Sequence, residues 1–387
     1  MKKVFIRAPL LTYSGYGTHS RQIFRWLLSK KNLQITTGIV PWGLTPWMIN
    51  PDIENGLVGE IMARSTMNPV EGTDISIQLQ LPNEWDSNIA KTNIGMSAVV
   101  ETDVCNPQWI DSCNKMDHVV VPSEHARTCL MNTGNIQTRL DVVPEGFYHN
   151  INDHDPELLN LDINTKFNFL IFGQITGTNP HNDRKNLFNT IKWICETFKD
   201  DPDVGIVIKT NSGRNTKIDK RMTTNLMRKL LEEVRPGPYP KVHLIHGALE
   251  PQEIGAIYRH PQIKALVSLT RGEGFGLPIL EAAACGLPII ATNWSGHLDF
   301  MKLGKFIPVN YMLKEIDASR VDKSIFMKEA KWAEPIEDDA KKKLKKFRHN
   351  PRKPKEWAVE LKDKILPKYN QDKLNDLYDE VLGRYLD

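Results

Sequence analysis

The chain has 387 residues, of which 40% are hydrophobic, so it is long enough to form two domains with separate cores. Its formal net charge of +3 excludes neither anionic nor neutral partners until the distribution of charge along the chain is considered. The five cysteines are odd in number and include no C-x-x-C pair, which argues against a disulfide framework and against a zinc site.

The N-terminal third of the chain alternates predicted strands and helices. Residues 3–10 predict a strand, Ser14 to Gly17 predict a flexible turn, and an amphipathic helix is expected from Thr18. Gly15 and Gly17 suit a plain turn, because the full G-x-G-x-x-G dinucleotide pattern is absent. Residues 40–69 show no clean period and are expected to be irregular.

Two carboxylates follow a predicted strand of this region. Strands are expected at residues 75–81 and 93–100, and the second ends at Glu101 and Asp103. Strand ends of a doubly wound domain face the ligand crevice, where a carboxylate can orient or deprotonate an acceptor hydroxyl. A solvated turn with a capping aspartate is the alternative. Strands at 117–123 and 140–146 and a helix at 124–132 complete a domain over residues 1–150, before a polar linker at 147–166.

A second domain, residues 165–310, repeats the alternation. Strands are expected at 167–173, 204–209, 242–246 and 264–270, with helices at 184–198 and 221–234. Arg184 and Lys185 stand where the first of these helices begins. Cations have the wrong sign for a helix N-terminus, so a bound anion such as a diphosphate is indicated. Two solvated surface cations are the alternative.

The motif with the strongest functional signal follows the strand at 264–270. Residues 271–276 read RGEGFG, and Pro278 and the sequence ILEAAAC predict a helix directly afterwards. Loop amides and two carboxylates eight positions apart, Glu273 and Glu281, suit a ligand with several hydroxyl groups. A glycine loop by itself also serves tight packing, so the pattern needs the longer string for its interpretation.

Residues 273–296, from EGFGLPILE to the final WSG, resemble the Glu-x7-Glu signature of retaining GT-B glycosyltransferases, such as sucrose and glycogen synthases. The resemblance covers residues 90–300 well and both ends loosely. It implies an α/β fold of two Rossmann-like, doubly wound domains facing a cleft, with a C-terminal helix (371–387) returning to the first domain. It places the donor sugar on Glu273 and the glycine loop, the ribose on Glu281 and the diphosphate on Lys185.

The resemblance has one departure, because Gln174 stands where the family has an arginine after the first strand of this domain. Arg184 or Lys209 would have to replace that charge. The loop at His246 and Gly247 corresponds to the one that meets the nucleobase. The family resemblance also makes Gly15 and Gly17 candidate contacts with the donor phosphates. The predicted donor-binding residues are Gly15, Gly17, Lys209, His246, Gly247, Gly274, Phe275, Gly276, Leu277 and Glu281.

The implied activity is retaining, metal-independent transfer of a sugar from a nucleotide-diphosphate donor, expected to be a UDP-sugar, to an acceptor hydroxyl. The predicted catalytic residues are Glu273, Lys185, Arg184, Glu101 and Asp103. No D-x-D pair ends a strand, so cations and helix amides are expected to stabilise the leaving diphosphate without a metal. No cofactor is expected beside the donor. In the family the donor phosphate is thought to accept the proton of the acceptor.

The C-terminal part differs in charge. Residues 311–370 predict a basic helical extension, with 317–337 polar and ambiguous, and residues 341–355 carry nine cations and no acid. A solvated helix face is one interpretation, and a contact with nucleic-acid phosphates is the other. The second would make the acceptor a hydroxymethylated base in DNA, as in phage DNA glucosyl- or arabinosyltransferases. A non-catalytic nucleic-acid-binding protein on a GT-B scaffold is a further alternative.

Without DNA as a partner, the expected acceptor is a saccharide or a small molecule. No run approaches 18 apolar residues and no signal-peptide pattern opens the chain. We therefore expect a cytoplasmic protein, in the host cytoplasm if it is viral.

Overall fold

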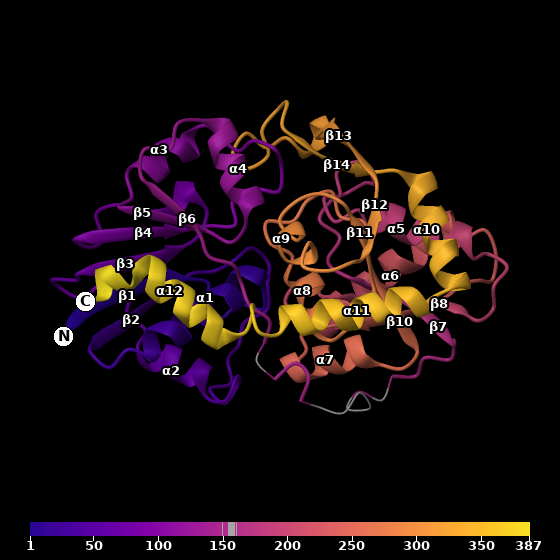
Figure 1. Ribbon diagram of the computed structural model, residues 1–387, viewed down its shortest axis with the longest axis horizontal. Coiled ribbons are helices and arrows are strands. Elements are labelled where there is room, and N and C mark those ends of the chain that lie inside the picture. The colour runs from indigo at the N-terminus through magenta and orange to yellow at the C-terminus, as the bar shows by residue number, and fades with distance from the viewer. Residues whose placement is uncertain (149, 154–158, 160) are drawn as a thin grey trace. The chain divides into compact units, whose positions relative to one another are not determined.

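The computed structural model describes residues 1–148, 150–153, 159 and 161–387. The chain divides into two compact units, which are described separately. The first comprises Met1–Gly146, Lys323–Met327 and Gln371–Asp387, and the second Phe147–Asp322 and Lys328–Asn370. Each unit contains one parallel six-stranded sheet, so the predicted α/β fold with two Rossmann-like sheets is confirmed (Figure 1).

The sheet of the first unit has the order β2-β1-β3-β4-β5-β6. Its strands are β1 (Lys2–Ala8), β2 (Leu33–Ile39), β3 (Ile75–Leu79), β4 (Thr92–Met96), β5 (His118–Val121) and β6 (Arg139–Val142). The helices are α1 (Gly15–Leu28), α2 (Leu57–Ala63), α3 (Gln108–Asn114), α4 (Glu124–Thr133) and α12 (Gln371–Leu386), with a short 3-10 turn η1 (Pro82–Glu84). Residues 40–69, predicted to be irregular, therefore contain a helix.

The C-terminal helix α12 belongs to the first unit, as the fold class predicted. Its buried Leu374, Tyr378 and Leu382 share one hydrophobic core with α1 and β1. Figure 1 shows α12, in yellow, beside α1. The Tyr378 hydroxyl lies 3.1 Å from His19 Nε2, and Trp26 Nε1 donates to Asp379 Oδ1 at 2.8 Å. The amphipathic pattern at the end of the sequence thus closes the core that the first strand begins.

The start of α1 corrects the prediction of a flexible glycine turn. The helix begins at Gly15, because the Ser14 hydroxyl caps it by accepting from the Gly17 amide at 3.0 Å. Gly17 is buried, and a Cβ at this position would lie 2.2 Å from the Thr12 carbonyl oxygen. Close packing thus accounts for this glycine.

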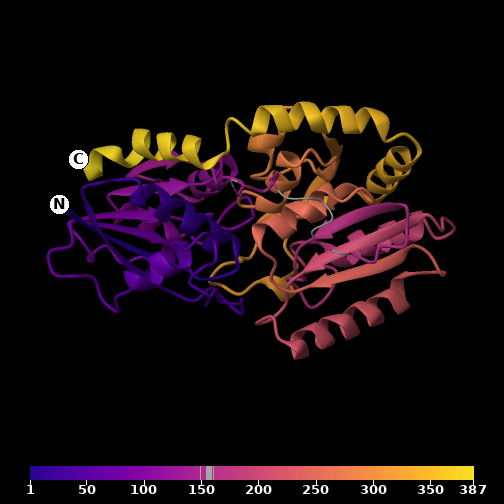
Figure 2. The ribbon, with the colours of Figure 1, turned by 90° about the horizontal axis from the view of Figure 1, so that it is seen from below.

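The sheet of the second unit has the order β12-β11-β10-β7-β8-β9. Its strands are β7 (Phe167–Phe172), β8 (Val204–Thr210), β9 (Lys241–His246), β10 (Ile263–Ser268), β11 (Ile289–Thr292) and β12 (Ile307–Val309). The helices are α5 (Leu187–Thr197), α6 (Lys217–Val234), α7 (Pro251–Arg259), α8 (Leu277–Ala284), α9 (Leu298–Met301), α10 (Glu337–His349) and α11 (Arg352–Ile365). Figure 2 shows α6 and α11 on opposite faces of this sheet, where they join two separate cores.

Two segments of the second unit contain more structure than the sequence predicted. The supposed helical extension at 311–370 opens with an antiparallel hairpin, β13 (Tyr311–Glu315) and β14 (Lys331–Pro335), whose connection contains the 3-10 turn η3 (Ala318–Arg320). The supposed linker at 147–166, in its described part, contributes the buried Ile151 and Ile163 to the core. Neither feature was predicted, because a few buried side chains in a short segment show no period.

Candidate active site

The order of strands in the second unit reverses between β7 and β10. From β7 the chain proceeds to β8 and β9 on one side of the sheet, and from β10 to β11 and β12 on the other. The loops that follow β7 and β10 therefore leave the same edge in opposite directions. Ligands of open α/β sheets bind at this kind of switch point. The predicted cations follow β7 and the glycine loop follows β10.

Lys185, Arg184 and Glu273 meet at this switch point. Lys185 Nζ donates to both carboxylate oxygens of Glu273 at 2.7 Å, and Arg184 Nη1 lies 3.7 Å from Glu273 Oε2. Glu273 is only 7% exposed. Burial acts to raise the pKa of Glu273, but the charges of Lys185 and Arg184 lower it below its usual value. The site therefore holds an ionised, nearly buried carboxylate under two cations.

The side chains on both sides of Lys185 are bonded to the backbone that leads into the glycine loop. Arg184 Nη1 donates to the Gly272 carbonyl at 2.7 Å, and Asn186 Nδ2 donates to the Leu269 carbonyl at 3.0 Å. Asn186 has a positive φ of 54° and caps α5. The two loops thus hold each other in place, and the cations are oriented before any ligand binds.

Ser295 and His297 support the other side of the glycine loop, and sequence reasoning missed both. The Glu273 amide donates to Ser295 Oγ at 2.9 Å, and Ser295 Oγ lies 3.4 Å from His297 Nδ1. His297 Nε2 donates to the Thr292 carbonyl at 2.8 Å. Burial lowers the pKa of His297, which favours a neutral ring that accepts from Ser295. The only signal in the sequence was the WSG string at 294–296.

The glycines of this region permit close backbone contact. Gly276 has a φ of +103° where α8 begins, and a Cβ on Gly296 would lie 2.2 Å from the Gly274 carbonyl oxygen. The Phe275 ring is buried against Phe300, with the centroids 5.3 Å apart, and Leu277 is 8% exposed. Phe275 and Leu277 can therefore contact a donor mainly through their backbone.

Glu281 lies on α8, where its Oε2 accepts from the Tyr258 hydroxyl at 3.4 Å. Burial raises the pKa of Glu281 to about 7, and the long hydrogen bond from Tyr258 only partly offsets this effect. Tyr258 is itself fixed by stacking on Phe172, at 5.7 Å between centroids. A pair of ribose hydroxyls would supply the donors that this carboxyl needs in its ionised form.

Lys209, His246 and Gly247 form a second polar group beside the first. Lys209 is 4% exposed, and its ammonium donates to the Gly247 carbonyl. Burial lowers the pKa of Lys209 to about 8, and burial also lowers the pKa of His246. Within the described ranges His246 Nε2 has no hydrogen-bond partner. Lys209 and Arg184 thus each donate to a backbone carbonyl, but only Arg184 also lies within 4 Å of Glu273, at 3.7 Å.

The remaining predicted residues lie in the first unit. Gly15 is exposed, and Glu101 and Asp103 are partly buried in the loop after β4, where Asn132 Nδ2 donates to the Asp103 carbonyl at 3.2 Å. The structure thus assigns these predicted residues to a different unit from Glu273, Lys185 and Glu281.

The same loop of the first unit has a feature that the sequence did not reveal. The Tyr16 hydroxyl lies 3.0 Å from Ser97 Oγ and accepts from the Ala98 amide at 2.9 Å. Next to them Val99 has a φ of +58°, which is strained for a β-branched residue. Tyr16 also stacks on Trp42, at 3.8 Å between ring centroids. The loop before Glu101 is therefore held in one shape by neutral groups.

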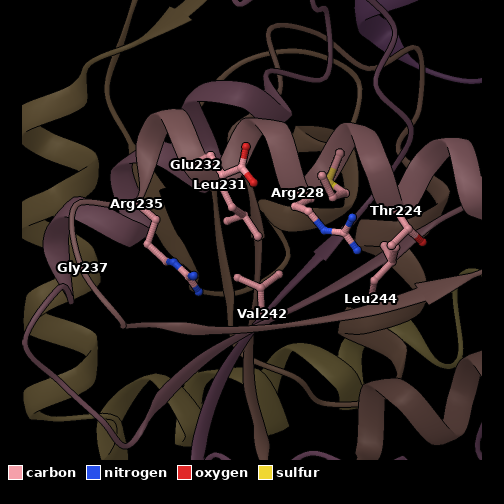
Figure 3. Close-up of a pocket in the computed structure, with 9 residues that line it drawn as sticks. Thr224, Arg228, Leu231, Glu232, Arg235, Gly237, Val242 and Leu244 are labelled. Atoms are coloured by element: carbon pink, nitrogen blue, oxygen red, sulfur yellow. The ribbon is translucent and has the colours of Figure 1, made fainter.

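A hollow elsewhere in the second unit contains none of these residues. Figure 3 shows it between α6 and β9, where Leu231, Val242 and Leu244 form its floor and Arg228 and Arg235 its rim. Its lining has two cations, Arg228 and Arg235, but only one carboxylate, Glu232, and none of the predicted site residues, so the switch point remains the better candidate. Among the described residues, no group of three or more His, Cys, Asp or Glu side chains is placed to hold a metal ion, and no helix could span a membrane.

Comparison with known families gives one match. Residues 238–321 match the family model described as "Glycosyl transferases group 1", a range that includes Glu273 and Glu281. Among curated protein sequences, none matches the chain.

Several solved structures share the fold. A protein from E. coli described as trehalose-6-phosphate bound with UDP-2-fluoro glucose has a TM-score of 0.63 at 10% identity, over 99% of both chains. Anabaena Alr3699/HepE in complex with UDP and glucose has a TM-score of 0.62 at 12% identity, over 99% of this chain and 100% of that one. Sucrose-phosphate synthase from Thermosynechococcus elongatus has a TM-score of 0.61 at 11% identity, over 100% of this chain and 99% of that one.

These likenesses define the fold class as GT-B, with two Rossmann-like sheets and a C-terminal helix that returns to the first unit. The family match over residues 238–321 supports a glycosyltransferase. At 12% identity or less, the solved structures establish the fold alone.

Proposed function

We propose that this chain is a retaining glycosyltransferase that moves a sugar from a nucleotide-diphosphate sugar to an acceptor hydroxyl without a bound metal ion. The observation that carries the proposal is the meeting of Lys185, Arg184 and Glu273 at the switch point of the second sheet. The family match over residues 238–321 and the UDP-containing structures of similar fold support it.

The leaving group would be stabilised by cations of this chain. Lys185 and Arg184 neutralise Glu273, and a bound diphosphate would share the same two cations. Negative charge develops on the diphosphate as the glycosidic bond breaks, so fixed cations lower the energy of the transition state more than that of the bound donor. The amides at the start of α8 add to this effect.

Glu273 and Glu281 would divide the recognition of the donor. Glu273 is ionised and nearly buried, so it can accept hydrogen bonds from sugar hydroxyls while Lys185 turns to the diphosphate. Glu281 lies in α8, which follows the glycine loop, and its carboxyl would bind the ribose diol there. Retention rests on the resemblance to the Glu-x7-Glu enzymes, in which the donor phosphate takes the proton of the acceptor.

A donor screen tests this proposal. UDP-, GDP- and ADP-sugars are incubated with a mixture of saccharides, small alcohols and hydroxymethylated DNA, and release of the nucleoside diphosphate is measured in excess EDTA. We expect release with one donor class, and the anomeric proton of the product should show retention in the NMR spectrum. Release that needs added magnesium or manganese contradicts the metal-free mechanism, and an inverted product contradicts retention.

DNA as the acceptor is a second candidate, which one surface favours. Lys342, Lys345, Lys346, Lys353 and Lys355 are exposed on α10 and α11. Four of the nine cations at 341–355 are instead ion-paired, namely Lys341 with Glu196, Lys343 with Asp339, Arg348 with Asp201, and Arg352 with Glu356. Part of the basic run is thus structural, and fewer cations remain for phosphates.

Salt dependence of duplex DNA binding distinguishes the two roles of this run. If Lys342, Lys345 and Lys346 contact phosphates, their triple substitution by Gln should flatten the log-log salt slope by about 0.9 for each phosphate that is no longer neutralised. The matched control removes three exposed cations of α6, Lys217, Arg228 and Lys229. An equal change in both triple variants, or no DNA binding at all, rejects DNA as the acceptor. DNA binding without release of nucleoside diphosphate would favour the non-catalytic alternative.

A further inference from the structure

We propose that Arg271 is a positioning residue that aims Arg184 and Lys185 at the donor diphosphate, and that the β13–β14 hairpin exists in this chain to hold Arg271. The inference rests on the proposed function, since it assigns a purpose to a residue behind the cation pair. It arises from a cluster that neither the motif nor the fold assigns.

Arg271 is almost completely buried directly before the glycine loop. It is 1% exposed, so its side chain cannot reach a ligand. Its guanidinium makes four hydrogen bonds: Nε and Nη2 donate to the two oxygens of Glu334 at 2.7 and 2.8 Å, and Nη1 donates to the Pro180 and Asp183 carbonyls at 2.9 and 2.6 Å. A lysine could not reproduce this planar fork, because its three donors diverge from one atom.

Three hydrogen bonds of Arg271 reach the segment that carries the cations, and the others reach β14. Beside the side-chain bond to Asp183, the Arg271 amide donates to the Arg184 carbonyl at 2.9 Å. Arg271 therefore donates hydrogen bonds to the carbonyls of both residues that precede Lys185, Asp183 and Arg184. Arg184 returns the contact through its bond to the Gly272 carbonyl at 2.7 Å. The loop after β7 and the loop after β10 are joined at Arg271.

The hairpin holds the other side of this arginine. Glu334 and Trp332 both lie on β14, with the Arg271 guanidinium carbon 5.4 Å from the Trp332 ring centroid. The Ala333 amide donates to the Arg271 carbonyl at 2.9 Å. The hairpin connection also binds the same loop, because Asn182 Nδ2 donates to Ser319 Oγ at 2.9 Å and Arg320 donates to the Thr176 carbonyl at 3.2 Å.

The hairpin therefore restricts the movement of residues 174–184, directly and through Arg271. In this chain Gln174 occupies the position of an arginine in the Glu-x7-Glu family, so the diphosphate charge must come from Arg184 and Lys185 on a long loop. A loop places a charge less accurately than a helix or strand unless neighbouring groups lock it. Arg271 and Glu334 provide that lock with a buried ion pair, which needs both partners.

The test compares a nucleoside diphosphate with its nucleoside. UDP and uridine, GDP and guanosine, and ADP and adenosine are titrated against the wild-type chain by calorimetry, and the pair that binds is used. In Arg271→Lys we expect the diphosphate affinity to fall about tenfold, as for loss of a charged hydrogen bond. The nucleoside affinity should change less than about twofold, within the additivity error for independent sites. A purely structural role would move both affinities together or neither.

Two further variants keep the test decisive. Glu334→Gln preserves the size of the side chain and should produce the same selective loss in smaller measure, even if Arg271→Lys fails to fold. Arg348→Lys is the matched control, because Arg348 also pairs with a carboxylate, Asp201, in the same unit. It should leave the affinity ratio of diphosphate to nucleoside unchanged. An unchanged ratio in folded Arg271→Lys or Glu334→Gln overturns the inference alone, whereas a wild-type chain that binds none of the diphosphates overturns the proposed function as well.

Discussion

The carboxyl-edge loops of the two sheets are built from different chemistry. In the second unit the loops after β7 and β10 bring an ionised carboxylate and two cations together, with Lys185 2.7 Å from Glu273. In the first unit the loop after β4 is held by neutral groups, with the Tyr16 hydroxyl between Ser97 and Ala98. One edge is organised around charge and the other around the shape of a strained loop at Val99.

This difference indicates a division of labour. A site that exchanges one anion for another needs fixed cations, which the second unit has. A site that orients a neutral hydroxyl needs a loop of defined shape, and its carboxylates Glu101 and Asp103 stay candidates for that role. Substitutions in the second unit should therefore change donor binding and turnover, and those in the first should change the use of the acceptor.

The largest effect is expected from Lys185→Ala. It removes a charge that should stabilise the leaving diphosphate and leaves the nearly buried Glu273 with Arg184 at 3.7 Å. Turnover should fall by about 10² to 10³, as when one transition-state donor is removed. Lys192→Ala is the matched control, because Lys192 lies on α5 and pairs loosely with Glu196 at 3.9 Å. Equal turnover in Lys185→Ala and wild type would show that Lys185 does not stabilise the leaving diphosphate.

Glu273→Gln should separate turnover from affinity. The amide keeps the shape but releases Lys185 from its ion pair, so the affinity for free nucleoside diphosphate should stay constant or rise. Turnover should fall about a hundredfold, because the contact with the sugar is strongest in the transition state. Steady-state kinetics and calorimetry on one preparation check both expectations. A parallel loss of affinity and turnover would show that Glu273 does not act on the sugar.

Binding of the nucleoside should depend on pH through Glu281, whose pKa is about 7. Only the ionised carboxylate accepts from both ribose hydroxyls, so affinity should rise between pH 6 and 8, by about tenfold at most if only that form binds. A nucleoside is the right probe because it carries no titrating phosphate. In Glu281→Gln the affinity should be lower and independent of pH, and a wild-type affinity that is flat over this range removes Glu281 from the ribose.

The same pKa has a consequence for stability, with the opposite sign to a usual carboxylate. The folded-state pKa of about 7 lies above the model-peptide value of 4.5, so the folded protein holds its proton more tightly than the unfolded chain. Below about pH 4.5 Glu281 is protonated in both the folded and the unfolded state, so its effect on the free energy of unfolding no longer changes with pH. The contribution of Glu281 to stability should fall as the pH rises from about 4.5 to 7 and level off above it, whereas buried histidines such as His19, whose pKa is lowered by burial, contribute in the opposite direction. Glu281→Gln should weaken this decline in denaturant titrations.

Tyr16→Phe should have the smallest effect on catalysis. It tests whether the first unit affects use of the acceptor but not binding of the donor. The Ala98 amide loses its acceptor, which should cost about 1–3 kcal/mol of stability. Nucleoside diphosphate affinity should not change, because Tyr16 belongs to the other unit. Transfer to the acceptor should slow more than hydrolysis of the donor by water. Tyr311→Phe on β13 makes the same chemical change as a control, and a loss of diphosphate affinity in Tyr16→Phe would contradict the division of labour.

Much of the fold was predictable, because parallel strands buried on both faces leave continuous apolar runs in the sequence. The runs that became β7, β8 and β10 were predicted within two residues of their ends. The hairpin β13–β14 was missed because β13 is mostly exposed, and because the buried residues of β14, Trp332, Ala333 and Pro335, do not alternate with exposed ones. The start of α1 was misplaced because glycines suggested a turn, whereas Ser14 supplied a cap.

The candidate site was predictable where one local string carried it. Glu273, Glu281 and the glycine loop lie within nine residues, and Lys185 was indicated by cations at a helix start. Ser295, His297 and Arg271 carried no such signal, since their roles depend on partners that the chain brings from elsewhere. Glu334, for instance, is 63 positions from Arg271. The basic run at 341–355 shows the same limit, because Lys341 pairs with Glu196, 145 positions away.

By itself, then, the sequence determined the α/β class, most strands, and the residue types at the glycine loop, because burial period and helix signals are local properties of a chain. Only the tertiary structure decided that Lys185 neutralises Glu273, that Lys209 serves Gly247, and that Arg271 is locked by Glu334. The physical reason is that an ion pair or a buried hydrogen bond depends on distance in space and on loss of water, and neither quantity can be read from spacing along the chain.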